Sequence, residues 1–180
     1  MKKDHEALFT VSKSSLKLFG YNENEMLEFV DLKSLEKEEK KYLLNQALVY
    51  LSKAEKSPLA FNEWLSKRKV IAEWKQEIIG FMTEKNILCE ARFAEAYSHK
   101  HLNRGGKPRW LIIKELESKQ VSKLVAEGID FDDNTSLKNY LKRHQFRFRE
   151  KKDKCIQSLH QKGFSSEVVH QVVELFSKGP

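Results

Sequence analysis

The sequence predicts an all-α protein made of tandem three-helix repeats, preceded by a small N-terminal appendage. Helical periodicity runs almost without interruption from Ser34, and the three prolines and seven glycines fall where helices are expected to end. Charged residues make up 33% of the chain and hydrophobic residues 40%, so the surface is large relative to the core. A row of small units produces that balance, and we therefore expect an elongated body.

The appendage is expected over residues 1–34. Leu8–Val11 is typical of a short β run. Ser12 is placed to cap a short helix that stops at Gly20.

Repeat 1 is expected over residues 35–86. Its second helix has the clearest start signal, because Ser57 can cap the helix and Pro58 suits the first helical position. The apolar positions of three successive helices follow the 3.6-residue period. They are Leu43, Ala47, Tyr50 and Leu51 in the first helix, Phe61, Trp64 and Leu65 in the second, and Ile71, Trp74, Ile78 and Met82 in the third.

Repeats 2 and 3 are expected over residues 87–130 and 131–180. In repeat 2, Pro108 starts the second helix and Ser122 caps a short third one. In repeat 3, one helix from Asn134 to Phe148 is followed by two more, separated at Gly163. The inward positions are Phe93, Ala96, Tyr97, Ile112 and Leu116 in repeat 2, and Leu137, Leu141, His144, Phe148, Ile156, Leu159, Val169, Val172 and Phe176 in repeat 3.

An internal match supports the repeat. Residues 65–70, 116–121 and 159–164 each contain a leucine, a base three positions later and an apolar residue two positions beyond that. We interpret the leucine as core, the base as a cation near the negative end of a helix, and the last residue as a plug over the following turn. The pattern falls at the same place in three units, which favours a true repeat.

The net charge of +7 lies entirely in the second half of the chain, because residues 1–90 contain equal numbers of basic and acidic side chains. Arg92–Lys123 and Lys138–Lys154 are basic, and the acidic segment Glu127–Asp133 lies between them. This asymmetry predicts a polyanionic or acidic partner. The alternative is a chance imbalance on solvated helix faces.

Several classes of protein are disfavoured. No stretch is long and apolar enough to span a membrane and the first residues are charged, so we expect a cytoplasmic protein without membrane association. Cys89 and Cys155 are expected to be reduced. His99 and His101 diverge on a helix, which disfavours a metal site. No catalytic arrangement is legible, and we predict a protein that is not an enzyme and has no cofactor.

Two segments carry candidate binding residues. On the expected helix 134–148, Lys138, Lys142 and Arg149 lie on one side with Phe146 among the bases, a pattern suited to phosphates and an exposed base. The alternative is that the aromatics of this helix close the junction between repeats.

The loop 104–109 combines glycines with three cations beside a helix start, a candidate anion site. Trp110 and Lys114 share the expected wet face of the next helix and could contact a partner, although burial of the tryptophan between repeats is an equal alternative. Phe93 and Tyr97 are interpreted as packing partners, with Arg92 free to point outward.

The order and spacing of several motifs resemble the RecX family, which regulates the RecA recombinase. Over residues 7–178, the most specific segment is Arg92–Tyr97, followed by Asn103–Gly105, Pro108–Arg109 and Lys114–Val121. The resemblance implies a curved, non-enzymatic row of three-helix repeats. Such a protein lies in the groove of the RecA–DNA filament and restrains ATP turnover and strand exchange, within homologous recombination, DNA repair and the SOS response.

We therefore expect a monomeric, RecX-like modulator of the RecA filament, with weak direct binding to DNA left open. One alternative is an independent helix-turn-helix-like DNA-binding regulator, and another is an adaptor whose charge only keeps it in solution. The candidate contact residues are Arg92, Lys100, Arg104, Lys107, Arg109, Trp110, Lys114, Lys138, Lys142, Arg143, Phe146, Arg147 and Arg149.

Overall fold

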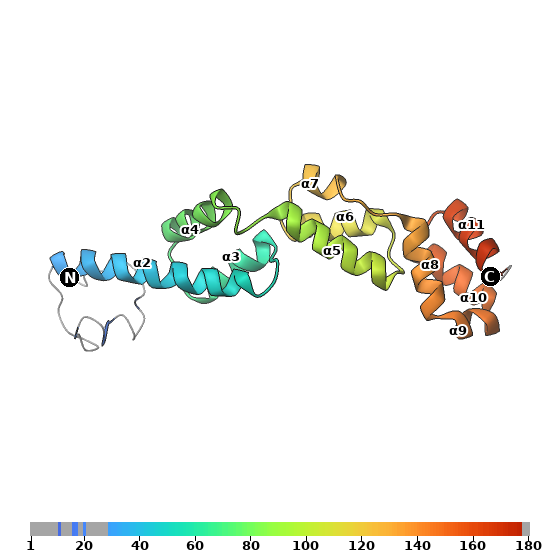
Figure 1. The fold of residues 1–180 in the computed structure, drawn as a ribbon, viewed down its shortest axis with the longest axis horizontal. Helices are drawn as coiled ribbons and strands as arrows, with labels where there is room; N and C mark the ends of the chain where they lie inside the picture. The colour runs from blue at the N-terminus through green and yellow to red at the C-terminus, as the bar shows by residue number, and fades with distance from the viewer. Residues whose placement is uncertain (1–10, 12–15, 18–19, 21–28, 178–180) are drawn as a thin grey trace, which may run out of the picture. The chain divides into compact units, whose positions relative to one another are not determined.

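The computed structural model describes residues 11, 16–17, 20 and 29–177, and the regular structure within these residues is helical (Figure 1). The chain divides into two compact units, Met1–Cys89 and Glu90–Pro180. Most of the expected appendage, including the β run before Val11, lies outside the described residues. Residues 16–17 are helical, and Gly20 has a φ of +76° in the turn that follows.

Unit 1 contains α2 (Phe29–Ser52), α3 (Pro58–Lys67) and α4 (Ala72–Glu84). The predicted start of α3 is confirmed, because the Ser57 side chain accepts a hydrogen bond from the Ala60 N–H at 3.1 Å. Helix α2 begins before Ser34, where the periodicity first indicates a helix. The buried cluster between the three helices consists of Leu43, Ala47, Leu51, Phe61, Leu65, Val70, Trp74, Ile78, Met82 and Leu88.

In unit 2, repeat 2 contains α5 (Glu90–Arg104), α6 (Arg109–Ser118) and α7 (Lys123–Glu127). Ile112 and Leu116 are fully buried, as predicted. The expected inward position of Ala96 is wrong, because Ala96 is exposed while its neighbours Ala94 and Ser98 are buried. The fully buried positions of α5 are therefore small residues, and Phe93, Tyr97 and Leu102 pack partly buried against the same core.

Repeat 3 contains α8 (Asp133–Arg143), α9 (Gln145–Glu150), α10 (Lys152–Gln161) and α11 (Ser166–Ser177). The predicted single helix from Asn134 to Phe148 is wrong, because the chain bends at His144, where φ is −111° and ψ is 22°. His144 is also exposed rather than inward. The short α9 that follows places the Phe148 ring edge-on against Phe176 of α11, with 5.8 Å between ring centroids.

The internal match corresponds to a repeated helix ending. The three leucines are fully buried, and the residue five positions after each donates its N–H to the leucine carbonyl, a geometry known as the Schellman motif. The residue that reverses the chain has a positive φ in each case. It is Lys69 at 56°, Gln120 at 63° and Gly163 at 88°. Shared backbone geometry at three places confirms the repeated plan that the residue pattern predicts.

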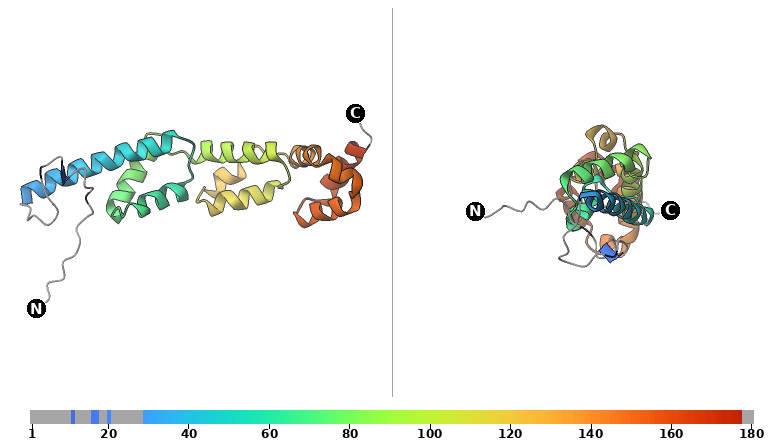
Figure 2. Two further views of the ribbon diagram at one scale, coloured as in Figure 1. Left: turned by 90° about the horizontal axis from the view of Figure 1, so that it is seen from below. Right: turned by 90° about the vertical axis from the view of Figure 1, so that its left-hand side faces the viewer.

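The joint between repeats 2 and 3 is formed by the end of α5 and by α8, which lie side by side in unit 2 (Figure 2). The Asn139 amide donates to the Leu102 carbonyl at 3.0 Å, and the Ser136 hydroxyl donates to the Lys107 carbonyl at 2.8 Å. A Cβ on Gly105 would collide with the backbone of α8. These contacts hold the backbone of the loop after α5 against α8.

Candidate polyanion-binding surface

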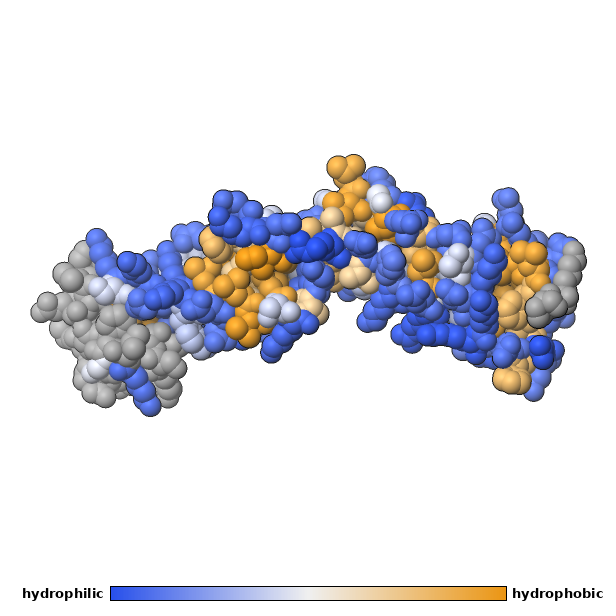
Figure 3. All heavy atoms as spheres, in the orientation of Figure 1, coloured by the Kyte–Doolittle hydropathy of each residue, from blue (hydrophilic) through white to orange (hydrophobic). Residues whose placement is uncertain are grey.

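Eight of the candidate cations are exposed and form no ion pair with any residue that the structure describes. They are Lys100 and Arg104 on α5, Lys114 on α6, Lys138, Lys142 and Arg143 on α8, and Arg147 and Arg149 on α9. Strongly hydrophilic side chains cover the lower part of α5 and α8 in Figure 3. Because no ion pair neutralises these charges, this part of unit 2 attracts anions.

The bend at His144 divides the bases that were expected on one helix. Lys138 and Lys142 belong to α8, whereas Arg149 belongs to α9, so the expected alignment of the three along a single helix face is wrong. The same bend separates two aromatic side chains. Phe148 is 4% exposed and packs in the core, while Phe146 is 75% exposed among the bases of α9. Phe146 is therefore available for stacking.

The loop after α5 meets the turn after α10 at a cavity of about 340 Å³. Its lining brings Arg104 and Lys107 together with Lys162, a residue that sequence reasoning missed. Tyr140 of α8 and His144 at the bend after it complete the wall, and the Lys162 ammonium lies 5.6 Å from the centroid of the Tyr140 ring. These residues come from separate helices without a shared period, so only the fold shows that they are neighbours.

Lys107 is already paired with a carboxylate. Its ammonium donates to Glu115 at 2.7 Å, and the Tyr97 hydroxyl donates to the same carboxylate at 2.8 Å. Burial raises the pKa of the Glu115 carboxyl, but the hydrogen bonds from Lys107 and Tyr97 outweigh this effect and hold its pKa below the ordinary value. Burial, together with the bond to Glu115, raises the pKa of Tyr97. This network fixes Lys107 rather than leaving it free for a ligand.

The start of α6 is occupied by an internal acid. The Arg109 N–H donates to a carboxylate oxygen of Asp133, and the Arg109 guanidinium donates to the Glu127 carbonyl. Burial is the main reason that the pKa of Asp133 is raised, although the hydrogen bond from Arg109 opposes the rise. The start of α6, which the sequence indicates as an anion site, is thus covered by Asp133 of the acidic segment Glu127–Asp133.

Trp110 combines features of both interpretations considered from the sequence. Its indole N–H donates to the Gly163 carbonyl at 2.9 Å, so one edge lies at the joint between repeats 2 and 3. The side chain is nevertheless 51% exposed. Arg92, by contrast, is half-buried and has a partner within the chain.

A cation over an aromatic ring accompanies each repeated helix ending. The capping base lies 3.7 Å from the Trp64 ring centroid in repeat 1, 5.5 Å from Tyr97 in repeat 2 and 5.6 Å from Tyr140 in repeat 3. These bases are Arg68, Lys119 and Lys162. Packing on a ring holds a charged head in place at a small cost in conformational freedom. The spacing of leucine and base predicts the caps but not their aromatic supports.

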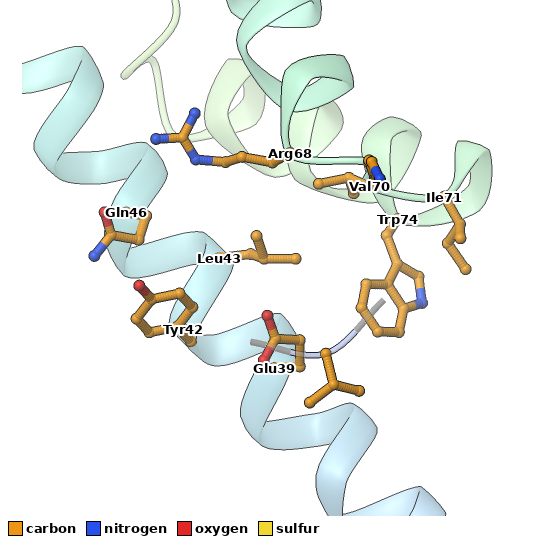
Figure 4. Close-up of a pocket in the computed structure, with 10 residues that line it drawn as sticks. Glu39, Tyr42, Leu43, Gln46, Arg68, Val70, Ile71 and Trp74 are labelled. Atoms are coloured by element: carbon orange, nitrogen blue, oxygen red, sulfur yellow. The ribbon is translucent and has the colours of Figure 1, made fainter. Parts of the chain in front are cut away.

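Unit 1 contains a cavity of about 220 Å³ between α2, the turn after α3 and α4. Figure 4 shows Glu39 of α2 and Trp74 of α4 at this hollow, with Arg68 at its edge. Glu39 is 3% exposed and has a partner within the chain, so the acid is part of the packing of this unit. Hydrophobic side chains also gather over α3 and α4 in Figure 3.

No cluster of three or more His, Cys, Asp or Glu side chains in the described part of the chain is arranged to hold a metal ion. None of the helices described has the length and apolar character needed to cross a bilayer.

Comparisons with known proteins point to one group. No protein-family model matches the sequence. The regulatory protein RecX of Streptococcus agalactiae serotype V is 26% identical over 141 residues, which cover 74% of this chain and 55% of that protein. RecX of serotype Ia of the same species is 25% identical over the same shares of both chains. The chain thus spans about half the length of the curated relatives it matches.

Solved structures agree in fold. A crystal structure of regulatory protein RecX superposes with a TM-score of 0.62 at 18% identity, covering 91% of this chain and 86% of that one. RecX from Lactobacillus salivarius gives a TM-score of 0.58 at 21% identity, covering 77% of this chain and 96% of that one. The resemblance to RecX that the sequence motifs indicate is therefore confirmed by independent matches in sequence and fold.

Proposed function

We propose that this chain, a RecX-type regulator, binds the filament that the RecA recombinase forms on DNA and inhibits ATP turnover and strand exchange. One observation supports the proposal most strongly. The cations of unit 2 that are exposed and form no ion pair lie on helices of a RecX-like fold, where they can meet the polyanion that such a filament contains.

Inhibition needs no catalytic group in this protein. A ligand that binds one state of a filament more tightly than another shifts the filament toward that state by the difference in binding free energy. Repeated helical units suit this role because each repeat can contact a different part of a periodic partner. The cations of α8 and α9 would then contribute both the rate of encounter and the register of the complex.

The direct test adds the protein to RecA assembled on single-stranded DNA. We expect ATP hydrolysis and strand exchange to fall as the protein is added, with half-inhibition well below the concentration of RecA subunits if each molecule spans several of them. Unchanged rates at a several-fold excess of the protein would rule the proposal out.

The second candidate is an independent DNA-binding regulator. It is favoured by the pairs of short helices joined by tight turns, which resemble the helix-turn-helix arrangement. Binding to duplex DNA without recombinase distinguishes the two. We expect weak, sequence-independent binding that falls with salt, whereas tight binding to one sequence at physiological salt would support the second candidate.

A further inference from the structure

We propose that the cavity between the loop after α5, helix α8 and the end of α10 is a binding site for a phosphate group. The cavity encloses about 340 Å³. Its ionisable side chains are basic or neutral, and no carboxylate is among them. The lining consists of His101, Arg104, Gly105, Gly106, Lys107, Tyr140, His144 and Lys162.

Two cations in the lining supply the free charge of the site. Arg104 closes α5 and Lys162 caps α10, and neither forms an ion pair with a residue that the structure describes. A guanidinium can donate two parallel hydrogen bonds to a pair of phosphate oxygens, and an ammonium adds a compact charge to a third. A tetrahedral anion with several acceptor oxygens uses both groups better than a single carboxylate does.

The backbone beside Arg104 and the side chain of Lys162 are held before any ligand arrives. A Cβ on Gly106 would lie 2.5 Å from the Tyr140 ring, so the loop that follows Arg104 passes directly against that ring. Lys162 lies over the Tyr140 ring as well, and the His144 ring lies 4.4 Å from it. Tyr140 is thus a common support for the whole wall. Side chains that are already positioned lose less conformational freedom when they bind.

The electrostatic surroundings also favour an anion. Burial is the main reason that the pKa of His101 is lowered; the charge of Lys107 lowers it further, and the charge of Glu115 opposes the change. The Lys107 ammonium is paired with the Glu115 carboxylate, which holds Lys107 in place in the wall of the cavity. Two other cavities have carboxylates in their linings, unlike this one. The cavity in unit 1 is lined by Glu39, and the cavity between α5 and α7 is lined by Glu95 and Asp130.

This inference rests on the proposed function for the source of the phosphate, because a DNA strand within a filament would supply it. The chemistry of the site is the same for a free phosphate ion and for the phosphodiester of a strand. The experiment therefore uses both probes and omits the recombinase, so that its failure leaves regulation of RecA to be judged separately.

The test follows the histidine ring protons by NMR in low-salt buffer free of phosphate, with inorganic phosphate in one titration and an eight-nucleotide oligothymidine in another. We expect saturable shifts at His101 and His144, but not at His99, His160 or His170. A response to both probes assigns the site to any phosphate, and a response to the oligonucleotide alone assigns it to a nucleic-acid strand.

Variants of the two cavity cations test whether the probes bind in this cavity. Replacing both cations, as Arg104→Glu with Lys162→Glu, should raise the dissociation constant at least tenfold for each probe that binds. Lys154→Glu, an exposed change on α10 outside the cavity, is the matched control and should leave it unchanged. If the acidic pair disturbs folding, the Arg104→Gln and Lys162→Gln pair replaces it. Equal shifts at all histidines, no shifts, or a double variant that responds like the natural protein would overturn the site.

Discussion

The indole N–H of Trp110 donates a hydrogen bond to the carbonyl oxygen of Gly163 at 2.9 Å, which ties α6 of repeat 2 to the turn between α10 and α11 in repeat 3. The two residues are also in close contact through their other atoms. Gly163 has a φ of +88°, and a Cβ there would lie 2.6 Å from the Trp110 ring. The chain reversal in repeat 3 therefore needs glycine for two reasons, its backbone angle and the neighbouring indole.

Replacing Gly163 by alanine should destabilise unit 2 by about 1–3 kcal/mol, from left-handed backbone strain and from overpacking against the indole. Urea denaturation followed by circular dichroism measures the change. In a Trp110→Ala background the cost should be smaller, because only the backbone strain remains. An equal cost in both backgrounds would contradict the close contact.

Replacing Gln120 by glycine should stabilise the protein by about 0.5–1 kcal/mol, because Gln120 has a φ of 63° at the repeated helix ending of repeat 2. The matched control is Lys119→Gly in the same turn, where φ is −93°. That change should destabilise, since it adds freedom to the unfolded chain without relieving strain and also removes the ammonium that lies over the Tyr97 ring. Thermal unfolding of the two variants should therefore shift in opposite directions, and a shared direction would refute the assignment.

Removing the Ser57 side-chain cap, as Ser57→Ala, should cost about 1 kcal/mol, because the N–H of Ala60 then loses its partner in a site where Ser57 is only 5% exposed. Ser122 is a natural control. It occupies the same position before α7, but its side chain makes no capping bond. Ser122→Ala should cost much less, and similar losses of stability in urea for both variants would show that the Ser57 bond is not the cause.

The Glu115 carboxylate should make stability depend on pH in the acid range. Its folded-state pKa lies below the ordinary value of 4.5, so its contribution is complete above 4.5 and is lost as the pH falls through the folded-state value. At pH 7 we expect Glu115→Gln to be about 1 kcal/mol less stable than the natural protein. The difference in free energy of unfolding between Glu115→Gln and the natural protein should become smaller as the pH falls below 4.5.

Glu117, exposed on the same helix, provides the control for that experiment. Glu117→Gln should be nearly neutral throughout the pH series. A constant gap between Glu115→Gln and the natural protein from pH 7 to pH 3 would show that the ionised carboxylate is not what stabilises the network of Lys107 and Tyr97.

The parts of the fold that depend on local chemistry could be predicted from the sequence. Ser57 and Pro58 mark the start of α3 because capping and the fixed proline φ act within one turn of the chain. The helix endings were predictable for the same reason. In each, a buried leucine, a capping base and an apolar plug lie within six consecutive residues.

Features that depend on tertiary contacts could not be predicted. No glycine or proline marks the bend at His144, and the bend is accompanied by packing of Phe148 against Phe176. Nothing in the periodicity distinguishes Ala94 from Ala96 as the inward residue. The cavity lined by Tyr140 and Lys162 joins residues from different helices, so the sequence offers no pattern that links them.

The most direct test of the central claim is inhibition of the RecA ATPase on single-stranded DNA by a variant with Lys138, Lys142 and Arg149 replaced by glutamate. If the basic surface of unit 2 binds the filament, the concentration for half-inhibition should rise at least tenfold while helicity by circular dichroism stays the same. A folded variant that inhibits as well as the natural protein would contradict the claim and would leave these charges with solubility as their role.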